Sequence, residues 1–369
     1  MISVIVFFLL FLLPFVIAPF GVTQFENPKV IAAEIGIILL LLISIFRAPS
    51  IRALRALRFV EMTRNWMYVV VILLTVIDLL FFRTSLSFFG NAFRMQGIFL
   101  LWMLLLFSFL SAHIQLKKIP WVVVFGLLLA EVIATVFLPL NESQRYVGTL
   151  GEPNASAAVM LFLWPFLWFS LPKDTWRHRL ILFSALFCVM LIIYLTASRS
   201  ALIGLIIQIV FLLLLWLKRK MKTAVLICLC LFLASFSLVF LQKDVLYENR
   251  LEVWTAGYFA GLSHPILGGG FGNTELLLQK EAQEHHLRVR YYYVDSAHNI
   301  FLDWWAQGGI IGLGALCFFI FSAFKRFVIA KEKRNIVLLL GLLTALSFNP
   351  ASVVGLVQLW WLIGNGVSD

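Results

Sequence analysis

The chain has 369 residues, of which 62% are hydrophobic and 13% are charged, and its mean hydropathy is +0.99. Apolar blocks of roughly the 17–25 residues needed to cross a bilayer recur along nearly the whole chain, which excludes an ordinary soluble protein. Lipid cannot satisfy backbone polar groups, and the blocks do not alternate with a period of two, so we expect helices to span the membrane. The sequence therefore predicts an all-α polytopic integral membrane protein.

The net charge of +11 does not indicate nucleic-acid binding, because the basic residues lie in short clusters between apolar segments. The cysteines lie inside apolar segments, which predicts small core residues and not disulfides or metal ligands. The first segment lacks a basic region before it and is interpreted as a retained helix. The cysteines are Cys188, Cys228, Cys230 and Cys317.

We predict about twelve membrane-spanning helices. The last two are separated only by Asn349 and Pro350, so a tight helical hairpin is one interpretation. The predicted spans are 2–20, 29–46, 66–82, 95–112, 120–139, 155–171, 180–196, 200–217, 223–241, 299–323, 335–348 and 350–367.

Basic clusters occur at every second connection, which by the positive-inside rule makes these connections and both termini cytoplasmic. In the first cluster, arginines recur every third residue between apolar positions, which predicts an amphipathic helix at about 48–64 on the inner leaflet. The clusters are Arg47/Arg52/Arg55/Arg58/Arg64, Lys117/Lys118, Lys173/Arg177/Arg179, Lys218/Arg219/Lys220/Lys222 and Lys325/Arg326/Lys331/Lys333/Arg334.

The longest polar interval, 242–298, separates helices predicted within 1–241 from those predicted within 299–369. It lies on the outer face in this topology, and we expect it to be partly helical and to carry site residues. The shorter outer connections carry single arginines beside turn residues, including Arg94, Arg145 and Arg199. Charged groups at membrane depth are costly and tend to be functional.

A series of motifs between about residues 145 and 315 resembles the O-antigen ligase and polymerase superfamily, which consists of bacterial membrane glycosyltransferases. The resemblance depends on the order and spacing of several short motifs and does not separate ligases from polymerases or protein O-glycosylating relatives. The motifs are Gly151-Glu152-Pro153-Asn154-Ala155, Thr196-Ala197-Ser198-Arg199, Arg250-Leu251-Glu252-Val253-Trp254, His264-Pro265-Ile266-Leu267-Gly268-Gly269-Gly270-Phe271-Gly272-Asn273, and His298-Asn299-Ile300-Phe301-Leu302 followed by Gly308-Gly309-Ile310-Ile311-Gly312.

The resemblance implies a GT-C-like fold in the bacterial inner membrane, with the active site on the periplasmic side and neither a metal nor another cofactor. The implied donor is a glycan on undecaprenyl diphosphate. An acceptor hydroxyl attacks the anomeric carbon, and the lipid diphosphate leaves. Such a reaction needs a base for the hydroxyl proton and positive charge for the diphosphate.

His298 suits the role of the base, because an ordinary imidazole is partly neutral near neutral pH. Arg199 and Arg250 suit the diphosphate, with Arg145 as a third candidate, because guanidinium groups bind phosphate oxygens in pairs and stay charged. The structural alternatives are a local hydrogen bond at a helix start for His298 and lipid-headgroup contacts for the arginines. The expected supporting residues are Asn154, Ser198, Trp254 and Asn299.

Three other sets of residues are weaker candidates for a functional site. The run Gly268–Gly272 has neither the preceding strand nor the following Lys-Ser/Thr of a phosphate loop, so we interpret it as a packing turn. His285 and His286, together with His298, lack metal-ligand spacing. The carboxylates expected inside the membrane are of the kind that a proton-coupled transporter would use. They are Glu34, Asp78, Glu131 and Asp303.

The preferred interpretation is a ligase that moves a glycan from undecaprenyl diphosphate to a hydroxyl of lipid A–core oligosaccharide. One alternative is a polymerase that joins lipid-linked repeat units. A second, of a different class, is a transporter or flippase for a lipid-linked sugar. The absence of a visible inverted repeat and the gathering of polar residues on one face oppose the transporter. The expected partners are the lipid-linked glycan, a hydroxyl acceptor and membrane lipids, and no nucleic acid.

Overall fold

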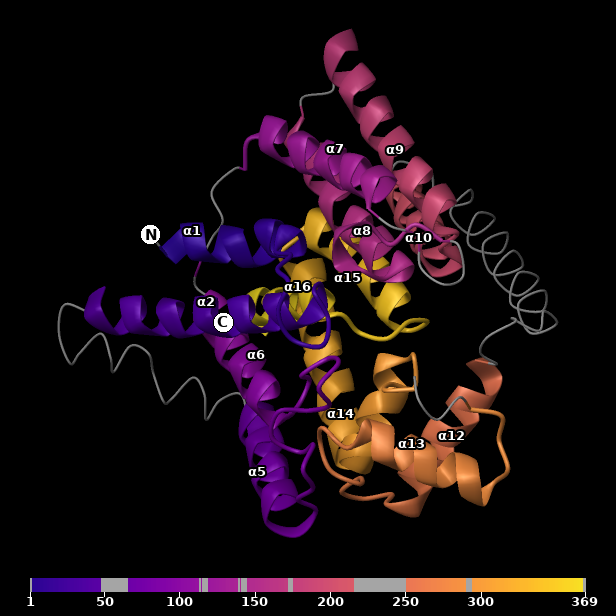
Figure 1. Ribbon diagram of the computed structural model, residues 1–369. Coiled ribbons are helices and arrows are strands. Elements are labelled where there is room, and N and C mark those ends of the chain that lie inside the picture. Colours follow the sequence, from indigo (N-terminus) through magenta and orange to yellow (C-terminus); the bar gives the residue numbers. More distant parts are fainter. Residues whose placement is uncertain are drawn as a thin grey trace.

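The computed structural model describes residues 2–47, 66–112, 114, 119–138, 140, 145–171, 175–215, 250–289 and 294–367. Apart from one isolated bridge between Leu140 and Tyr146, all regular structure in these ranges is helical (Figure 1). The all-helical prediction is thereby confirmed for the described residues. The predicted span at 223–241 and the amphipathic helix at about 48–64 lie outside them.

The thirteen α-helices in the described ranges follow the predicted segments closely. Three of them are long and apolar enough to cross a membrane by length and composition, at Glu26–Phe46, Trp176–Thr196 and Ile300–Ile329, and several shorter helices are also apolar. The α-helices are α1 (Ile2–Phe7), α2 (Glu26–Arg47), α5 (Trp66–Phe81), α6 (Ile98–Ser111), α7 (Trp121–Phe137), α8 (Pro153–Ser170), α9 (Trp176–Thr196), α10 (Arg199–Leu214), α12 (Arg250–Ser263), α13 (Thr274–Glu284), α14 (Ile300–Ile329), α15 (Lys333–Leu346) and α16 (Val353–Val367).

Three short helical turns accompany them: the π-helix η1 (Phe8–Leu12) and the 3₁₀ helices η2 (Leu13–Phe15) and η3 (Gly148–Leu150). The first predicted span, 2–20, is therefore not one continuous α-helix. Its helical structure changes type at Phe8 and ends at Phe15, where Pro14 occupies the second position of η2.

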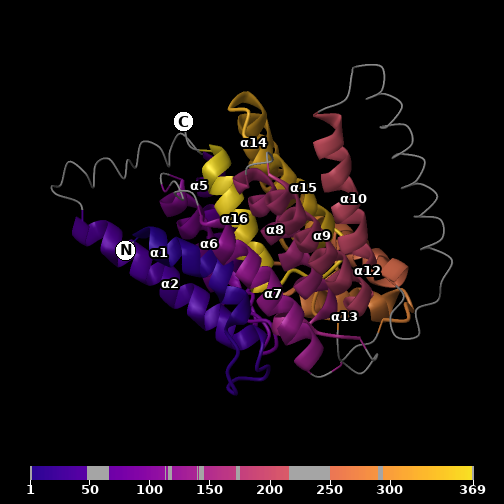
Figure 2. The same ribbon diagram turned by 90° about the horizontal axis from the view of Figure 1, so that it is seen from above.

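Helix α8 lies in the middle of the bundle, with α7, α9, α15 and α16 around it (Figure 2). It is apolar on all sides, which is the pattern of a helix that is buried all round. One buried polar side chain on α10, Gln208, is fully satisfied: it accepts from Trp164 Nε1 at 2.7 Å and donates to the carbonyls of Leu161 and Val337, both at 2.9 Å. Gly341 leaves room for it, since a Cβ there would lie 2.1 Å from Gln208 Nε2.

Helix α14 is broken at Gly309, where the backbone has φ 56° and ψ −154°. The glycine-rich run packs against this break: Gly269 and Gly270 donate backbone hydrogen bonds to the carbonyls of Ala306 and Gln307, both at 2.9 Å, and Ile310 donates to Pro265 at 2.9 Å. The predicted continuous span 299–323 is thus wrong in this respect, since the helix is interrupted and continues to Ile329. The run 268–272 is a packing turn, as expected.

The polar interval is partly helical, because its described residues contain α12 and α13, which lie together beside α14 (Figure 1). A small apolar cluster, separate from the main core, holds the two helices together and reaches the segment just before α14. It consists of Val253, Ala256, Leu278, Ala282, Val289, Val294 and Ala297. This packing places the start of α12 near the start of α14.

The break in α14 predicts a sharp difference between two glycines of the same helix. An alanine at Gly309 would adopt a left-handed φ, and its Cβ would lie 2.5 Å from the carbonyl oxygen of Ile266. We expect Gly309→Ala to lower the free energy of unfolding by more than about 2 kcal/mol. Gly314→Ala meets no atom within 4 Å and is expected to leave stability unchanged or raise it by up to about 1 kcal/mol. Thermal melting of the two variants in detergent compares them, and equal melting temperatures would contradict the role given to Gly309.

Candidate active site

His298 lies in a rigid turn immediately before α14. Its backbone is left-handed, with φ 54°, and its N–H donates to Ser296 Oγ at 3.0 Å. Asp303, one turn into the helix, accepts from the same Ser296 hydroxyl and from the Ala297 N–H, both at 2.7 Å. Asn299 is the N-cap of α14 and accepts from two N–H groups of the first turn, at 2.9 and 3.3 Å. The carboxylate of Asp303 thus holds the turn that presents the imidazole.

The imidazole of His298 is neutral over the physiological pH range. Burial, together with the smaller effects of the positive charges of Arg250 and Arg94, lowers its pKa from 6.5 to about 3. A neutral imidazole keeps a nitrogen lone pair that can accept a proton. The predicted base therefore lies in the state that general-base chemistry requires.

The three predicted arginines lie close enough to influence one another. Burial lowers the pKa of Arg145, and the charges of Arg250 and Arg199 lower it further, while Glu152 opposes this. Arg145 donates from Nε to the Thr196 carbonyl at 2.7 Å, which fixes it against the end of α9. Three cations gathered in a partly buried site form a binding place for a multiply charged anion.

The supporting residues hold these arginines in place. Arg145 donates to Asn154 Oδ1 at 3.0 Å, and Arg250 donates to Asn349 Oδ1 at 3.5 Å. Asn349 in turn donates to Ser200 Oγ at 2.6 Å, next to Arg199. Ser198 caps α10 by accepting from a backbone N–H at 3.4 Å. Asn154 and Ser198 therefore position the arginines and the helix that carries Arg199, whereas sequence reasoning did not point to Asn349.

Trp254 lies one turn after Arg250 on α12. Its ring packs against Phe348, with 6.0 Å between ring centroids. Its Nε1–H is buried and has no acceptor among the described residues. The indole is thus a hydrogen-bond donor on the same side of α12 as the cationic cluster.

Arg94 is a site residue that sequence reasoning noted but did not select. It lies in the connection between α5 and α6 and donates from Nε to Asp295 Oδ2 at 2.5 Å, three residues before His298. Burial opposes its charge, but Asp295, Glu152 and Glu26 together raise its pKa. The only sequence signal for it is a lone arginine at the outer end of a span.

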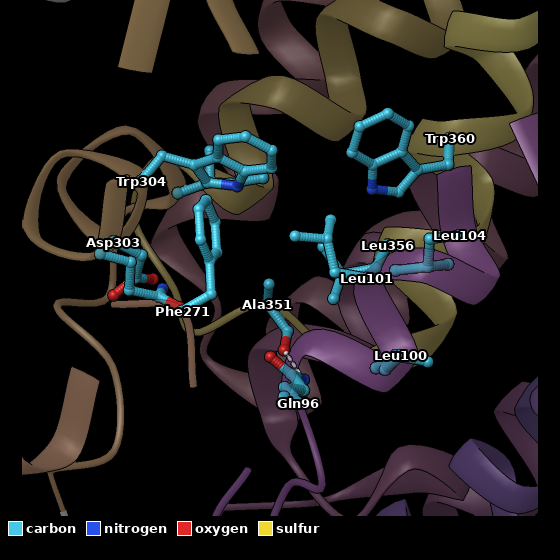
Figure 3. A pocket seen from close by; sticks show the side chains of 13 residues that line it. Gln96, Leu100, Leu101, Leu104, Phe271, Asp303, Trp304, Ala351, Leu356 and Trp360 are labelled. Carbon is cyan, nitrogen blue, oxygen red and sulfur yellow. Dashed lines mark hydrogen bonds between the residues drawn. The ribbon is translucent and has the colours of Figure 1, made fainter. Parts of the chain in front are cut away.

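A cavity of about 70 Å³ lies beside the His298 turn. Figure 3 shows the rings of Trp304 and Trp360 at one end and the hydrogen bond from Gln96 to the Ala351 carbonyl, at 2.6 Å, at the other. Leucines of α6 and α16 complete the wall, and Asp303 lies at its edge. The apolar lining suits a short hydrocarbon group next to the polar site.

Two of the carboxylates expected within the membrane have structural partners. Asp78 accepts from the Phe271 N–H at 3.1 Å and so helps to hold the glycine-rich run. Glu131 accepts from both the N–H and the hydroxyl of Thr149, at 3.2 and 2.6 Å. The contacts of Glu131 account for it without proton coupling, whereas the second carboxyl oxygen of Asp78, Oδ1, is buried and has no hydrogen-bond partner among the described residues.

Two comparisons with known proteins indicate which family this chain resembles. The family model described as O-antigen ligase matches residues 182–319. Residues 182–319 of this chain are thus similar to the O-antigen ligase family. A curated relative, the ComP-specific O-oligosaccharyltransferase of Acinetobacter baylyi, is 26% identical over 236 residues, which cover 55% of this chain and 42% of the relative. The chain thus spans less than half the length of that relative, and the family resemblance inferred from the motifs is confirmed.

The matched range contains three of the four charged residues predicted for the site: Arg199, Arg250 and His298. Arg145 and its partner Asn154 precede the matched region but contact it, because Arg145 binds the Thr196 carbonyl. The site is therefore completed by residues from outside the matched residues.

The Arg94–Asp295 pair predicts a non-additive effect on the stability of this protein. The two side chains are only 15% and 10% exposed, so Arg94→Met and Asp295→Asn should each lower the free energy of unfolding by about 3 kcal/mol. The double variant should recover part of this loss, since neither partner is then left alone. Lys280→Gln, which breaks the exposed pair with Glu284, serves as the control and should change stability by less than about 0.5 kcal/mol. Additive effects in a thermal-melting cycle would show that the buried pair is not coupled.

Proposed function

We propose that this protein is a glycosyltransferase that moves a glycan from undecaprenyl diphosphate to a hydroxyl group at the outer face of the bacterial inner membrane. The observation that carries the proposal is the neutral imidazole of His298 beside Arg250, which belongs to a cluster of three arginines. The O-antigen ligase match supports the same chemistry. In the proposed topology both termini are cytoplasmic and the site is periplasmic.

The proposed reaction is a single displacement. His298 accepts the proton of the acceptor hydroxyl, and the acceptor oxygen forms a bond to the anomeric carbon of the donor sugar. The bond from that carbon to the diphosphate oxygen breaks, and both electrons leave with the lipid diphosphate. Arg145, Arg199 and Arg250 hold the negative charge that develops there.

Binding of the donor also prepares the base. The negative diphosphate would offset the positive charges that lower the pKa of His298 in the free protein. The imidazole therefore becomes more basic when the substrate is in place. This coupling follows from the position of Arg250, which affects both groups.

The acceptor is proposed to be a hydroxyl of lipid A–core oligosaccharide. A second candidate is a protein hydroxyl, favoured by the relative, whose name is ComP-specific O-oligosaccharyltransferase. A polymerase would instead use a second lipid-linked glycan. All three share the donor and the proposed base, and they differ only in the hydroxyl that attacks.

The test of the proposal is transfer by purified protein in nanodiscs supplied with undecaprenyl-diphosphate glycan. The assay is run with lipid A–core, with a protein acceptor and without an added acceptor, and the mass of the product distinguishes the three reactions.

We expect His298→Gln to lower the transfer rate by about 10²–10⁴-fold, because no base then takes the hydroxyl proton. His285→Gln is the control, since that imidazole is stacked on Phe259 and pairs with Glu281 outside the site. Normal turnover in His298→Gln would contradict the base, and donor movement across vesicles without transfer would favour the flippase.

Arg250→Gln is expected to change both the rate and its pH dependence. Loss of one guanidinium at the diphosphate should lower the rate by about 10²–10³-fold. The pH profile of kcat/KM reports the free protein, in which the pKa of His298 is about 3. The acid limb of this profile, which is the fall in kcat/KM caused by protonation of His298, is therefore expected well below pH 6.5. Removing a neighbouring positive charge raises this pKa, and the acid limb should move to higher pH. Lys280→Gln, on the exposed side of α13, should alter neither, and an unmoved limb in Arg250→Gln would contradict the assigned proximity.

A further inference from the structure

Two buried carboxylate oxygens near His298 have no hydrogen-bond donor among the described residues. Asp295 is 10% exposed, and its Oδ2 binds Arg94 while its Oδ1 is buried and unpartnered. Glu152, which precedes α8, accepts from Asn154 at Oε1, and its Oε2 is buried and unpartnered. A buried acceptor without a donor is destabilising, so such an atom in a native structure calls for a partner.

Asp295 and Glu152 each lie near a residue that is proposed to take part in the reaction. Asp295 lies three residues before His298, and Arg94 links it electrostatically to both Glu152 and the imidazole. Asn154 contacts both Glu152 and Arg145, so Glu152 adjoins the cationic cluster. Asp295 therefore lies near the base, and Glu152 lies next to the arginines.

The chemistry of these oxygens excludes one part of the donor and fits another. Carboxylate oxygens accept hydrogen bonds, whereas diphosphate oxygens have no proton to give and carry the same charge. Sugar hydroxyls are donors. In the displacement proposed above, the sugar ring must lie between the base and the diphosphate. It would then lie between Asp295, which is near the base, and Glu152, which is next to the arginines.

We propose that Glu152 Oε2 and Asp295 Oδ1 bind hydroxyl groups of a sugar ring at the reaction centre, and so form a sugar subsite separate from the arginine cluster. This inference rests on the proposed function. The hydroxyls come either from the donor sugar that carries the diphosphate or from an acceptor sugar.

Glu152→Gln is the most informative variant. Its amide oxygen can still accept from Asn154, while an NH₂ donor replaces the acceptor Oε2. Binding is measured in nanodiscs with undecaprenyl diphosphate and with the same lipid carrying one hexose. We expect wild type to bind the hexose-bearing lipid about tenfold more tightly, as one hydrogen bond to a charged group suggests. Glu152→Gln should bind the bare lipid normally and lose this preference. Glu284→Gln, on the exposed side of α13, is the matched control.

The acceptor source is tested by the KM for an acceptor oligosaccharide. If Glu152→Gln keeps its preference for the hexose-bearing lipid but raises this KM about tenfold, the bound hydroxyls belong to the acceptor. If neither quantity changes, the sugar subsite is refuted, although binding of the bare lipid still supports the arginine cluster. If wild type neither binds the bare lipid nor transfers glycan, the proposed function itself fails.

Discussion

The arrangement of the site depends on the contact between the glycine-rich run and the break in α14. Backbone hydrogen bonds join Gly269 and Gly270 to carbonyls on one side of Gly309, and Pro265 to Ile310 on the other. A side chain at Gly268 or at Gly309 would push the two segments apart, because its Cβ would lie 2.2 or 2.5 Å from a carbonyl oxygen of the other segment. Since the run directly follows α12, this contact orients the helix that carries Arg250 against the helix that follows His298.

The charged residues around His298 form two groups that differ in their partners. Arg145, Arg199 and Arg250 form a cationic side, in which Arg145 donates to the Thr196 carbonyl and Asn154, and Arg250 donates to Asn349. Arg94 instead lies among carboxylates, and its bridge to Asp295 fixes the segment before His298. In a partly dry site each charge acts strongly on its neighbours, so the cations Arg250 and Arg94 act together with burial to keep the imidazole of His298 neutral.

The predicted residues differ in how well the structure accounts for them. Arg145, taken as the weakest of the three arginine candidates, is held by two hydrogen bonds, to Thr196 and Asn154, whereas Arg199 is exposed at the start of α10. Asn299 proved to be a helix cap, a role that its position before an apolar segment already suggests. Arg94 and Asn349 were missed as site residues because each acts through a partner more than 90 residues away in the chain.

The sequence alone determined the helical class and most helix positions, because apolar periodicity is a local pattern, and its short motifs predicted Arg199, Arg250 and His298 as site residues. It also indicated that the glycine-rich run is a turn. Only the tertiary structure decided that α14 breaks at Gly309, that Arg94 binds Asp295, and that one carboxyl oxygen each of Glu152 and Asp295 is buried without a hydrogen-bond donor among the described residues. These features arise where distant segments meet, and the free energy of such contacts depends on burial and charge that no single stretch of sequence contains.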